Sequence, residues 1–264
     1  MSAGELFSAG KLREAIPAAL DEVKKSPMEP GLRWRLCELL CFAGDLERAD
    51  KQLEAVISQF PKLATNAILF RQLIRAETAR QQLWTDGRLP EFPYQPSPAV
   101  ERSLEATVHV RVGDLAKAAA LVEQAEDGRT RKRGNVDAKP FDDFRDLDDV
   151  LGPVLEVLTG DGKYLWVGFD QIRSLKFVAP ERSRDLLWRS ADLRATDLNA
   201  HVHIPALYPL THREEDDTLR LGRSTDWRGG ENEPVRGVGQ RMWLAGNEQL
   251  SIMDVKEIHF DADA

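Results

Sequence analysis

The segment GKLREA at residues 10–15 recurs as GDLERA at residues 44–49, and this repetition decides the fold of the first half of the chain. The two copies begin 34 residues apart (44 minus 10), and Pro27 and Pro61 keep the same offset. A glycine, a leucine two residues later, an alanine five residues later and a terminal proline all stay in phase. We therefore interpret the offset as a structural repeat.

Each residue type that stays in phase has a physical role in a helical hairpin. The glycine closes the turn between two antiparallel helices, because it adopts left-handed backbone angles without strain. The alanine lets the two helices approach closely, and the proline ends the second helix. A period of 34 residues is typical of tetratricopeptide repeats, so the sequence predicts an N-terminal TPR-like α-α superhelix.

A third copy of the motif extends the array but breaks its period. GDLAKA at residues 113–118 begins 69 residues after Gly44 (113 minus 44), which is two periods plus one. Between these copies, residues 62–84 carry apolar side chains at helical spacing. The copy expected near Thr78 lacks the Gly-Asp turn, so we predict one long helix there instead of a hairpin.

The remainder of the first half reads as a loop followed by another hairpin. Residues 85–98 contain four prolines and predict a loop. Helices should resume over residues 99–125, with a break at Gly113. We therefore predict a first domain at residues 1–128, with about seven helices stacked as a short solenoid.

Stacked helix pairs leave a groove, and such grooves bind peptides or helices of other proteins. In the second repeat, Trp34, Glu38 and Phe42 follow one another at intervals of four residues, which places them on one helix face. We take these three residues as candidates for partner binding. For Trp34 and Phe42 the alternative is ordinary core packing, and for Glu38 it is exposure to solvent.

A change in composition marks the start of a second unit. Residues 129–139, RTRKRGNVDAK, hold five cations, and we interpret residues 129–140 as a solvated linker rather than a nucleic-acid patch. Residues 141–151 then place phenylalanine, leucine and valine at helical spacing, with aspartates 142–149 on the opposite side. This pattern predicts an amphipathic helix with a solvated acidic face.

After Gly160 the sequence pattern is typical of short strands separated by turns that contain Gly, Asp and Pro. Residues 141–264 therefore predict a smaller α+β domain, mostly β, with an antiparallel sheet or partly open barrel. The strands are expected over residues 164–169, 172–178, 186–188, 200–208, 219–223, 240–244 and 248–260.

A survey for catalytic and metal-binding motifs gives no positive result. Cys37 and Cys41 are four residues apart on one helix, but a zinc site needs two further ligands and the chain has no other cysteine. His201 and His203 share a face of a strand and could hold a metal with a carboxylate, although two ordinary strand residues explain them as well. We therefore expect no metal, no cofactor and no enzymatic activity.

Composition excludes several classes of protein. The 264 residues include 36 Lys and Arg against 44 Asp and Glu, which gives a formal net charge of −8. An acidic chain is a poor general binder of nucleic acid or of anionic membranes. The absence of a long apolar run and of an export signal, together with only two cysteines, favours a cytoplasmic protein.

The chain resembles a known family along nearly its whole length. The segments that carry the resemblance occur in one order: LFSAGKL at 6–12, DLDDVLGPVLEV at 146–157, GKYLWV at 162–167, LLW at 186–188, PALYP at 205–209, LGRSTDW at 221–227 and GVGQR at 237–241. Together they are similar to the ImpE/TagJ (SciE-type) family. Gly168 departs from the family pattern, in which a proline follows the Trp-Val pair, and the loop at residues 129–139 is variable.

This resemblance implies an accessory protein of bacterial type VI secretion, a machine that fires a contractile sheath. The implied role is to bind the N-terminal helix of the small, TssB-type sheath subunit and to link it to sheath recycling by the ClpV-type ATPase. The family supplies no catalytic residues to carry over.

Three other hypotheses stay open on the sequence alone. The first is a generic TPR-type scaffold or chaperone for an unrelated protein partner. The second is an enzyme that uses His201, His203 and the aspartates of residues 142–149. The third is nucleic-acid binding through Arg129 to Arg133, which the net charge disfavours.

Overall fold

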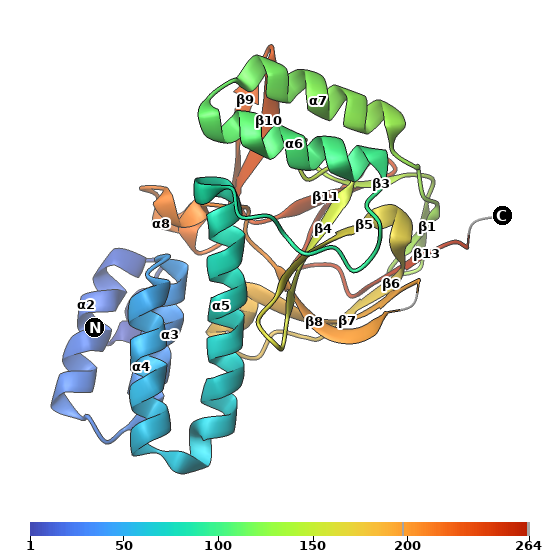
Figure 1. Ribbon diagram of the computed structural model, residues 1–264. Coiled ribbons are helices and arrows are strands. Elements are labelled where there is room, and N and C mark those ends of the chain that lie inside the picture. Colours follow the sequence, from blue (N-terminus) through green and yellow to red (C-terminus); the bar gives the residue numbers. More distant parts are fainter. Residues whose placement is uncertain (197, 263–264) are drawn as a thin grey trace.

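The computed structural model describes residues 1–196 and 198–262. Helices make up the first half of the chain and antiparallel strands most of the second (Figure 1). Among these described residues, no helix is both long enough and apolar enough to cross a membrane.

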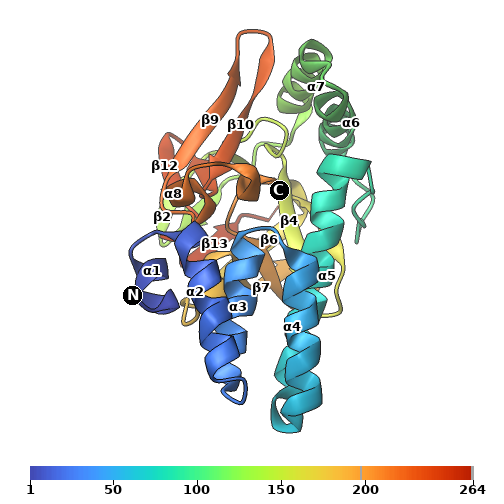
Figure 2. The same cartoon turned by 90° about the vertical axis from the view of Figure 1, so that its left-hand side faces the viewer.

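Residues 1–128, all of them described, form seven α-helices and one short 3-10 turn. These elements are α1 (Ala3–Ser8), α2 (Leu12–Lys25), α3 (Pro30–Phe42), α4 (Leu46–Gln59), η1 (Pro61–Leu63), α5 (Ala64–Asp86), α6 (Pro98–Val112) and α7 (Leu115–Gly128). Helices α2 to α5 stand side by side, and the hairpin of α6 and α7 lies beyond one end of α5 (Figure 2).

The three repeated glycines close helical turns of the same geometry. Gly10, Gly44 and Gly113 have φ angles of +80°, +74° and +78°. In each turn, the amide of the following residue donates to the carbonyl five residues back at 2.9 Å, which is the Schellman arrangement. In the second and third turns, Asp45 and Asp114 then cap the next helix through their carboxylates. The predicted hairpins are present, while their assignment to the tetratricopeptide class stays a prediction.

Helix α5 runs without interruption through the position where the repeat lacks its glycine turn. It covers Ala64–Asp86 and ends at Gly87, which matches the helix predicted over 62–84 and the loop predicted after it. That loop is anchored to the sheet at Glu91. Its amide donates to the Tyr164 carbonyl and its carbonyl accepts from the Trp166 amide, both at 3.0 Å.

The second half is built on an open antiparallel sheet of eight strands, in the order β2-β1-β13-β6-β7-β8-β4-β5 among the described residues. Its strands are β1 (Gly134–Val136), β2 (Lys139–Phe141), β4 (Val154–Thr159), β5 (Tyr164–Gly168), β6 (Ile172–Phe177), β7 (Trp188–Ala195), β8 (Asn199–Pro205) and β13 (Glu257–Phe260). Of the two predicted alternatives, the open sheet is the one observed, and no barrel closes.

Smaller elements complete the second half. A three-stranded sheet pairs β3 (Phe144–Asp146), β11 (Met242–Ala245) and β12 (Glu248–Ser251). The hairpin of β9 (Thr225–Gly230) and β10 (Glu233–Gly239) projects from the molecule next to α7 (Figures 1 and 2). The short helices are η2 (Phe169–Gln171), η3 (Ser183–Leu186), η4 (Thr211–Arg213) and α8 (Asp217–Arg220).

The amphipathic helix predicted over residues 141–151 is wrong. This segment contains the end of β2, all of β3 and a series of turns. Asp146 and Asp148 are 0% and 2% exposed, so they do not form a solvated face. The Asp148 carboxylate accepts from the Val150 and Leu151 amides at 2.9 and 3.1 Å, and such local bonds stabilise a turn in competition with a helix.

Two further expectations for the second half need correction. The segment predicted as a solvated linker, residues 129–140, contains β1, which pairs with β13 inside the main sheet. The strand predicted over residues 219–223 is instead the end of α8 and a turn at Gly222, whose φ is +64°. The Asp216 carboxylate caps α8 by accepting from the Thr218 amide, which favours the helix.

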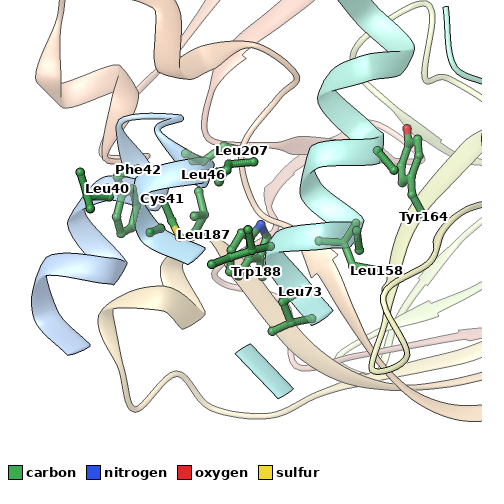
Figure 3. Close-up of a cluster of buried hydrophobic side chains, with 14 of the residues drawn as sticks. Leu40, Cys41, Phe42, Leu46, Leu73, Leu158, Tyr164, Leu187, Trp188 and Leu207 are labelled. Atoms are coloured by element: carbon green, nitrogen blue, oxygen red, sulfur yellow. The ribbon is translucent and has the colours of Figure 1, made fainter. Parts of the chain in front are cut away.

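The two faces of the main sheet pack against different partners. One face meets the helices in a common core: the Phe70 ring of α5 lies 6.0 Å from the Trp188 ring of β7, edge to face. Figure 3 shows Leu73 of α5 and Leu158 and Trp188 of the sheet within this core. The other face carries a second core, in which Phe144 and Trp243 pack with 5.6 Å between ring centroids.

Candidate protein-binding site

The three candidate residues of α3 lie on one face, but their exposure falls steadily along the helix. Trp34 is partly buried, with its ring 5.6 Å from that of Phe70. Glu38, one turn later, is 7% exposed, and Phe42 is 1% exposed and packs on Phe7 at 5.6 Å. Trp34 is therefore the most exposed of the three, while Phe42 is a core residue.

A segment of the sheet half covers this face of α3 where the burial increases. Residues 179–186, which we call the strap, connect β6 to β7 and include η3. The guanidinium of Arg184 lies 5.6 Å from the Trp34 ring centroid and 5.0 Å from that of Phe70, within the range of cation–π attraction. Sequence reasoning missed this segment, because it carries no periodic pattern.

Hollows open on both sides of the strap. One, of about 460 Å³, lies against α3 and the start of α5 and is lined by Trp34 and Leu63. The other, of about 360 Å³, lies between α5, β7 and β8 and is lined by Leu69 and Val178. Arg182 lines both, so we treat the two hollows as one surface and call it the trough.

Apolar side chains on the trough are unusually open to solvent. Leu69 is 52% exposed and Val178 is 45% exposed. Both line the second hollow, beside the strap. Exposed apolar side chains beside a concave surface are typical of a site that binds another protein.

Burial sets the charge states at the base of the trough. It raises the pKa of the Glu38 carboxyl, while Arg184 and a hydrogen bond to Ser183 oppose that rise. Burial and the neighbouring His201 lower the pKa of His203 to about 4, so that His203 is neutral at neutral pH. The trough therefore combines apolar side chains with the buried Glu38 carboxyl and with charged residues, among them Arg35, Glu181 and the arginines of the strap.

The histidines proposed for an enzyme lie at the margin of the trough. His201 Nε2 is 2.8 Å from Ser190 Oγ, and His201 Nδ1 is 2.9 Å from Asp192 Oδ1. Cross-strand register explains this row, since His201 pairs with Asp192. The side chains of His201 and Asp192 are 56% and 66% exposed, and such open groups lack the water-excluded setting that strengthens catalytic electrostatics.

The aspartates of residues 142–149 belong to a different part of the molecule. Asp146 accepts from the Tyr208 hydroxyl at 3.0 Å and Asp148 from the Gly237 amide at 3.0 Å. Across residues 1–196 and 198–262, no group of three or more His, Cys, Asp or Glu side chains is placed to hold a metal ion. The structure therefore does not bring the histidines and the aspartates together as an enzyme site.

Packing also accounts for the two cysteines and for Arg129, the first residue of the cationic segment. Burial raises the pKa of the Cys37 and Cys41 thiols, which makes both poor nucleophiles and metal ligands. In the cationic segment, Arg129 is 4% exposed and binds Glu126 and Asp143. An arginine so paired is not free to contact phosphate.

A buried charge cluster joins α5 to the sheet behind the trough. Arg80 of α5 donates to both carboxylate oxygens of Glu156 on β4 at 2.9 Å, and to Glu77 at 3.2 Å. Arg241 also binds Glu156. Burial alone would raise the pKa of Glu156, but the two arginines outweigh it and hold that pKa at about 2. The cluster fixes the helix that forms one wall of the trough.

Comparison with known proteins agrees with this architecture. Residues 138–259 match the model of the family described as ImpE protein. The chain is 34% identical over 266 aligned positions to the type VI secretion system accessory component TagJ of Pseudomonas aeruginosa, covering 99% of this chain and 92% of that protein.

A solved structure extends the likeness to three dimensions. The crystal structure of a protein from Vibrio parahaemolyticus superposes with a TM-score of 0.92 at 28% identity, covering 99% of this chain and 98% of the other. The match thus spans the helical half, the strap and the sheet together. The chain belongs to the ImpE/TagJ family of type VI secretion accessory proteins.

Proposed function

We propose that this protein is a non-catalytic adaptor of the type VI secretion system, and that its trough binds the N-terminal helix of the small, TssB-type sheath subunit. The observation that carries the proposal is the apolar trough between α3, α5 and the strap, in a chain 34% identical to a type VI secretion accessory component. Through that contact the adaptor would present the sheath to the ClpV-type ATPase that recycles it.

The geometry supports a helix as the ligand. An amphipathic helix places apolar side chains at i, i+3, i+4 and i+7, which form a stripe that fits a groove between helices. A micromolar complex corresponds to about 8 kcal/mol, and a few buried anchors at about 2 kcal/mol each supply much of it. Trp34, Leu63 and Leu69 line the trough in positions where such anchors could dock.

The sheet half has a supporting role in this proposal. The bonds from Arg80 to Glu156 on β4 fix α5, which carries Leu69. Because binding energy is lost when a site must first be ordered, a rigid wall raises affinity.

Calorimetric titration with a peptide covering the N-terminal helix of the cognate small sheath subunit tests this proposal. We expect Leu69→Asp to weaken binding at least about tenfold, because it places a charge on the apolar wall. Leu89→Asp is the matched control, since Leu89 is 66% exposed and lies in the loop after α5. Equal affinity of the two variants would contradict the placement of the site, and no binding of either peptide or full subunit would contradict the choice of partner.

A further inference from the structure

The backbone of the strap forms a self-contained turn. Among the described residues, its backbone hydrogen bonds are local: the Asp185 amide donates to Arg182 at 3.0 Å, and the Leu187 amide donates to Arg184 at 3.0 Å. The Asp185 carboxylate accepts from the Glu181 and Arg182 amides, both at 2.9 Å. These bonds stabilise the turn from within the strap.

Sheet hydrogen bonds hold the strap only at its two ends. The Val178 amide donates to Ser190 at 2.9 Å before the strap, and the Leu187 carbonyl accepts from the Ala206 amide at 2.9 Å after it. Residues 179–182 are exposed, and residues 183–186 are only partly buried. These ends are natural hinges, because no strand pairing has to break between them.

Side chains alone seat the strap on the helices, and they do so as a bound peptide would. Arg184 places its guanidinium over the rings of Trp34 and Phe70. Ser183 lies near the buried Glu38 carboxyl and favours its charged form, which lowers the pKa of Glu38. Leu186 packs against the core shared by helices and sheet. Within four residues the strap thus supplies a cation for an aromatic pair, a hydroxyl near a carboxyl group, and a leucine for an apolar surface.

We propose that the strap is an internal ligand of the trough, and that the external partner is a helix that takes its place by presenting a lysine or arginine to the Trp34–Phe70 pair with leucine-type side chains beside it. The proposal rests on the proposed function and states the chemistry of that partner. Glu38 makes the site complementary to a cation, because this buried side chain interacts favourably with the charge of Arg184.

An internal ligand lowers the apparent affinity for the external one. The dissociation constant observed equals the intrinsic constant divided by the fraction of molecules with the strap released. Weakening the seat of the strap should therefore tighten partner binding, whereas weakening an ordinary wall of the trough should loosen it. Whether partner binding tightens or loosens therefore distinguishes an internal ligand from a wall of the trough.

Arg184→Ala tests the proposal in the full-length protein. Titrated with the sheath-subunit peptide, this variant should bind about three- to tenfold more tightly than the wild type, because the cation–π seat is lost. Arg173→Ala is the matched control: it removes the same charge from an exposed position of β6 that lines neither hollow, and its affinity should stay within about twofold. Unchanged or weaker binding by Arg184→Ala would overturn the internal-ligand role while leaving the adaptor function intact.

A second arm decides the proposal even if the sheath peptide binds nothing, which would count against the proposed function alone. Residues 180–186 are replaced by an equal number of glycines and serines, and a thermal melt verifies folding. A synthetic peptide of residues 179–188 should bind this variant at least about tenfold more tightly than the wild type, in which the strap occupies the site. Equal or undetectable binding to both proteins would overturn the proposal.

Discussion

Arg80 forms the buried ion pair that connects the helical half to the sheet half. It is 4% exposed, lies in the C-terminal half of α5 and donates to carboxylates on its own helix and on β4. Removing one partner of a buried ion pair leaves the other charge unsatisfied in a medium that solvates it poorly. The cost of such a change is set by the charge left behind rather than by the bond lost.

We predict that Arg80→Met lowers the free energy of unfolding by about 3 kcal/mol or more, because Glu77 and Glu156 lose their shared cation. The control is Arg71→Met. Arg71 lies in the same helix as Arg80 and binds Asp50 of α4, but both side chains of this pair are 35% exposed, so the loss should stay below about 1 kcal/mol. Urea unfolding measures both, and equal losses would contradict the role given to Arg80.

The buried aspartates give stability an unusual dependence on pH. Burial raises the pKa of Asp148 to about 7 and that of Asp146 to about 6 in the folded protein. The charge of Asp146 adds to the rise at Asp148. A folded pKa above the unfolded value means that the folded state binds more protons between the two values. The contribution of these groups is therefore full at acid pH and is lost as pH rises through about 7.

Comparison with Asp148→Asn isolates this effect from the other titrating groups. We predict that the stability of the wild type relative to this variant falls by about 2 kcal/mol between pH 5 and pH 8. Urea midpoints at the two pH values measure the difference. A relative stability that stays constant, or that rises with pH, would show that Asp148 is not protonated in the folded state.

At the scale of elements, the repeated glycine turns were predictable because their requirement is local. A left-handed residue after a helix strongly favours glycine, so the sequence marks each turn directly. The turns differ only in their surroundings. An added Cβ at Gly44 would lie 2.3 Å from the His212 ring, whereas one at Gly113 would meet nothing within 4 Å.

We predict that Gly113→Ala costs about 1 kcal/mol, the strain of a left-handed alanine, and that Gly44→Ala costs at least about 1 kcal/mol more. The additional loss would arise from displacing His212, which lies between the helices and the sheet half. Thermal or urea unfolding of the pair measures the contrast. Equal losses would mean that the His212 contact adds nothing to stability.

The sheet half was harder to predict because its signals depend on distant partners. Phe141 and Phe144 are three residues apart, a spacing that fits a helix, yet they belong to two different strands, β2 and β3, and their ring centroids are 5.4 Å apart. The aspartates that follow look like a solvated face until Tyr208 and Gly237, which bind them, are in place. Only the fold shows that these carboxylates are buried.

The sequence also indicates only one side of the candidate site, because the other side depends on tertiary structure. The sequence placed Trp34 on a groove-forming helix, and the structure leaves it partly exposed beside the trough. The strap, which forms the other side, has no periodicity and reaches α3 only through tertiary structure. Sequence patterns reveal helix faces, but they do not reveal which irregular segment crosses them.

At the scale of the whole molecule, helices and sheet share one hydrophobic core. Phe70, Leu73 and Leu83 of α5 are buried in the same cluster as Trp166 and Trp188 of the sheet. Separating the halves would expose this surface along with the charges of Arg80 and Glu156. The two sequence-predicted domains should therefore depend on each other for stability.

We predict that the full chain unfolds in a single cooperative transition and that residues 1–128 alone lack a cooperative melt. Circular dichroism against temperature tests both. A sharp transition for the isolated helical half, close in midpoint to that of the full chain, would contradict a shared core.

Hydrogen exchange of the full protein, with and without the N-terminal helix of the cognate small sheath subunit, is the most direct test of the adaptor site. The account predicts slower exchange along α3 and the first half of α5, faster exchange at Asp185 and Leu187 in and next to the strap, and no change in the β9–β10 hairpin. Protection confined to the hairpin or to α6 and α7, with α3 and α5 unchanged, would contradict it.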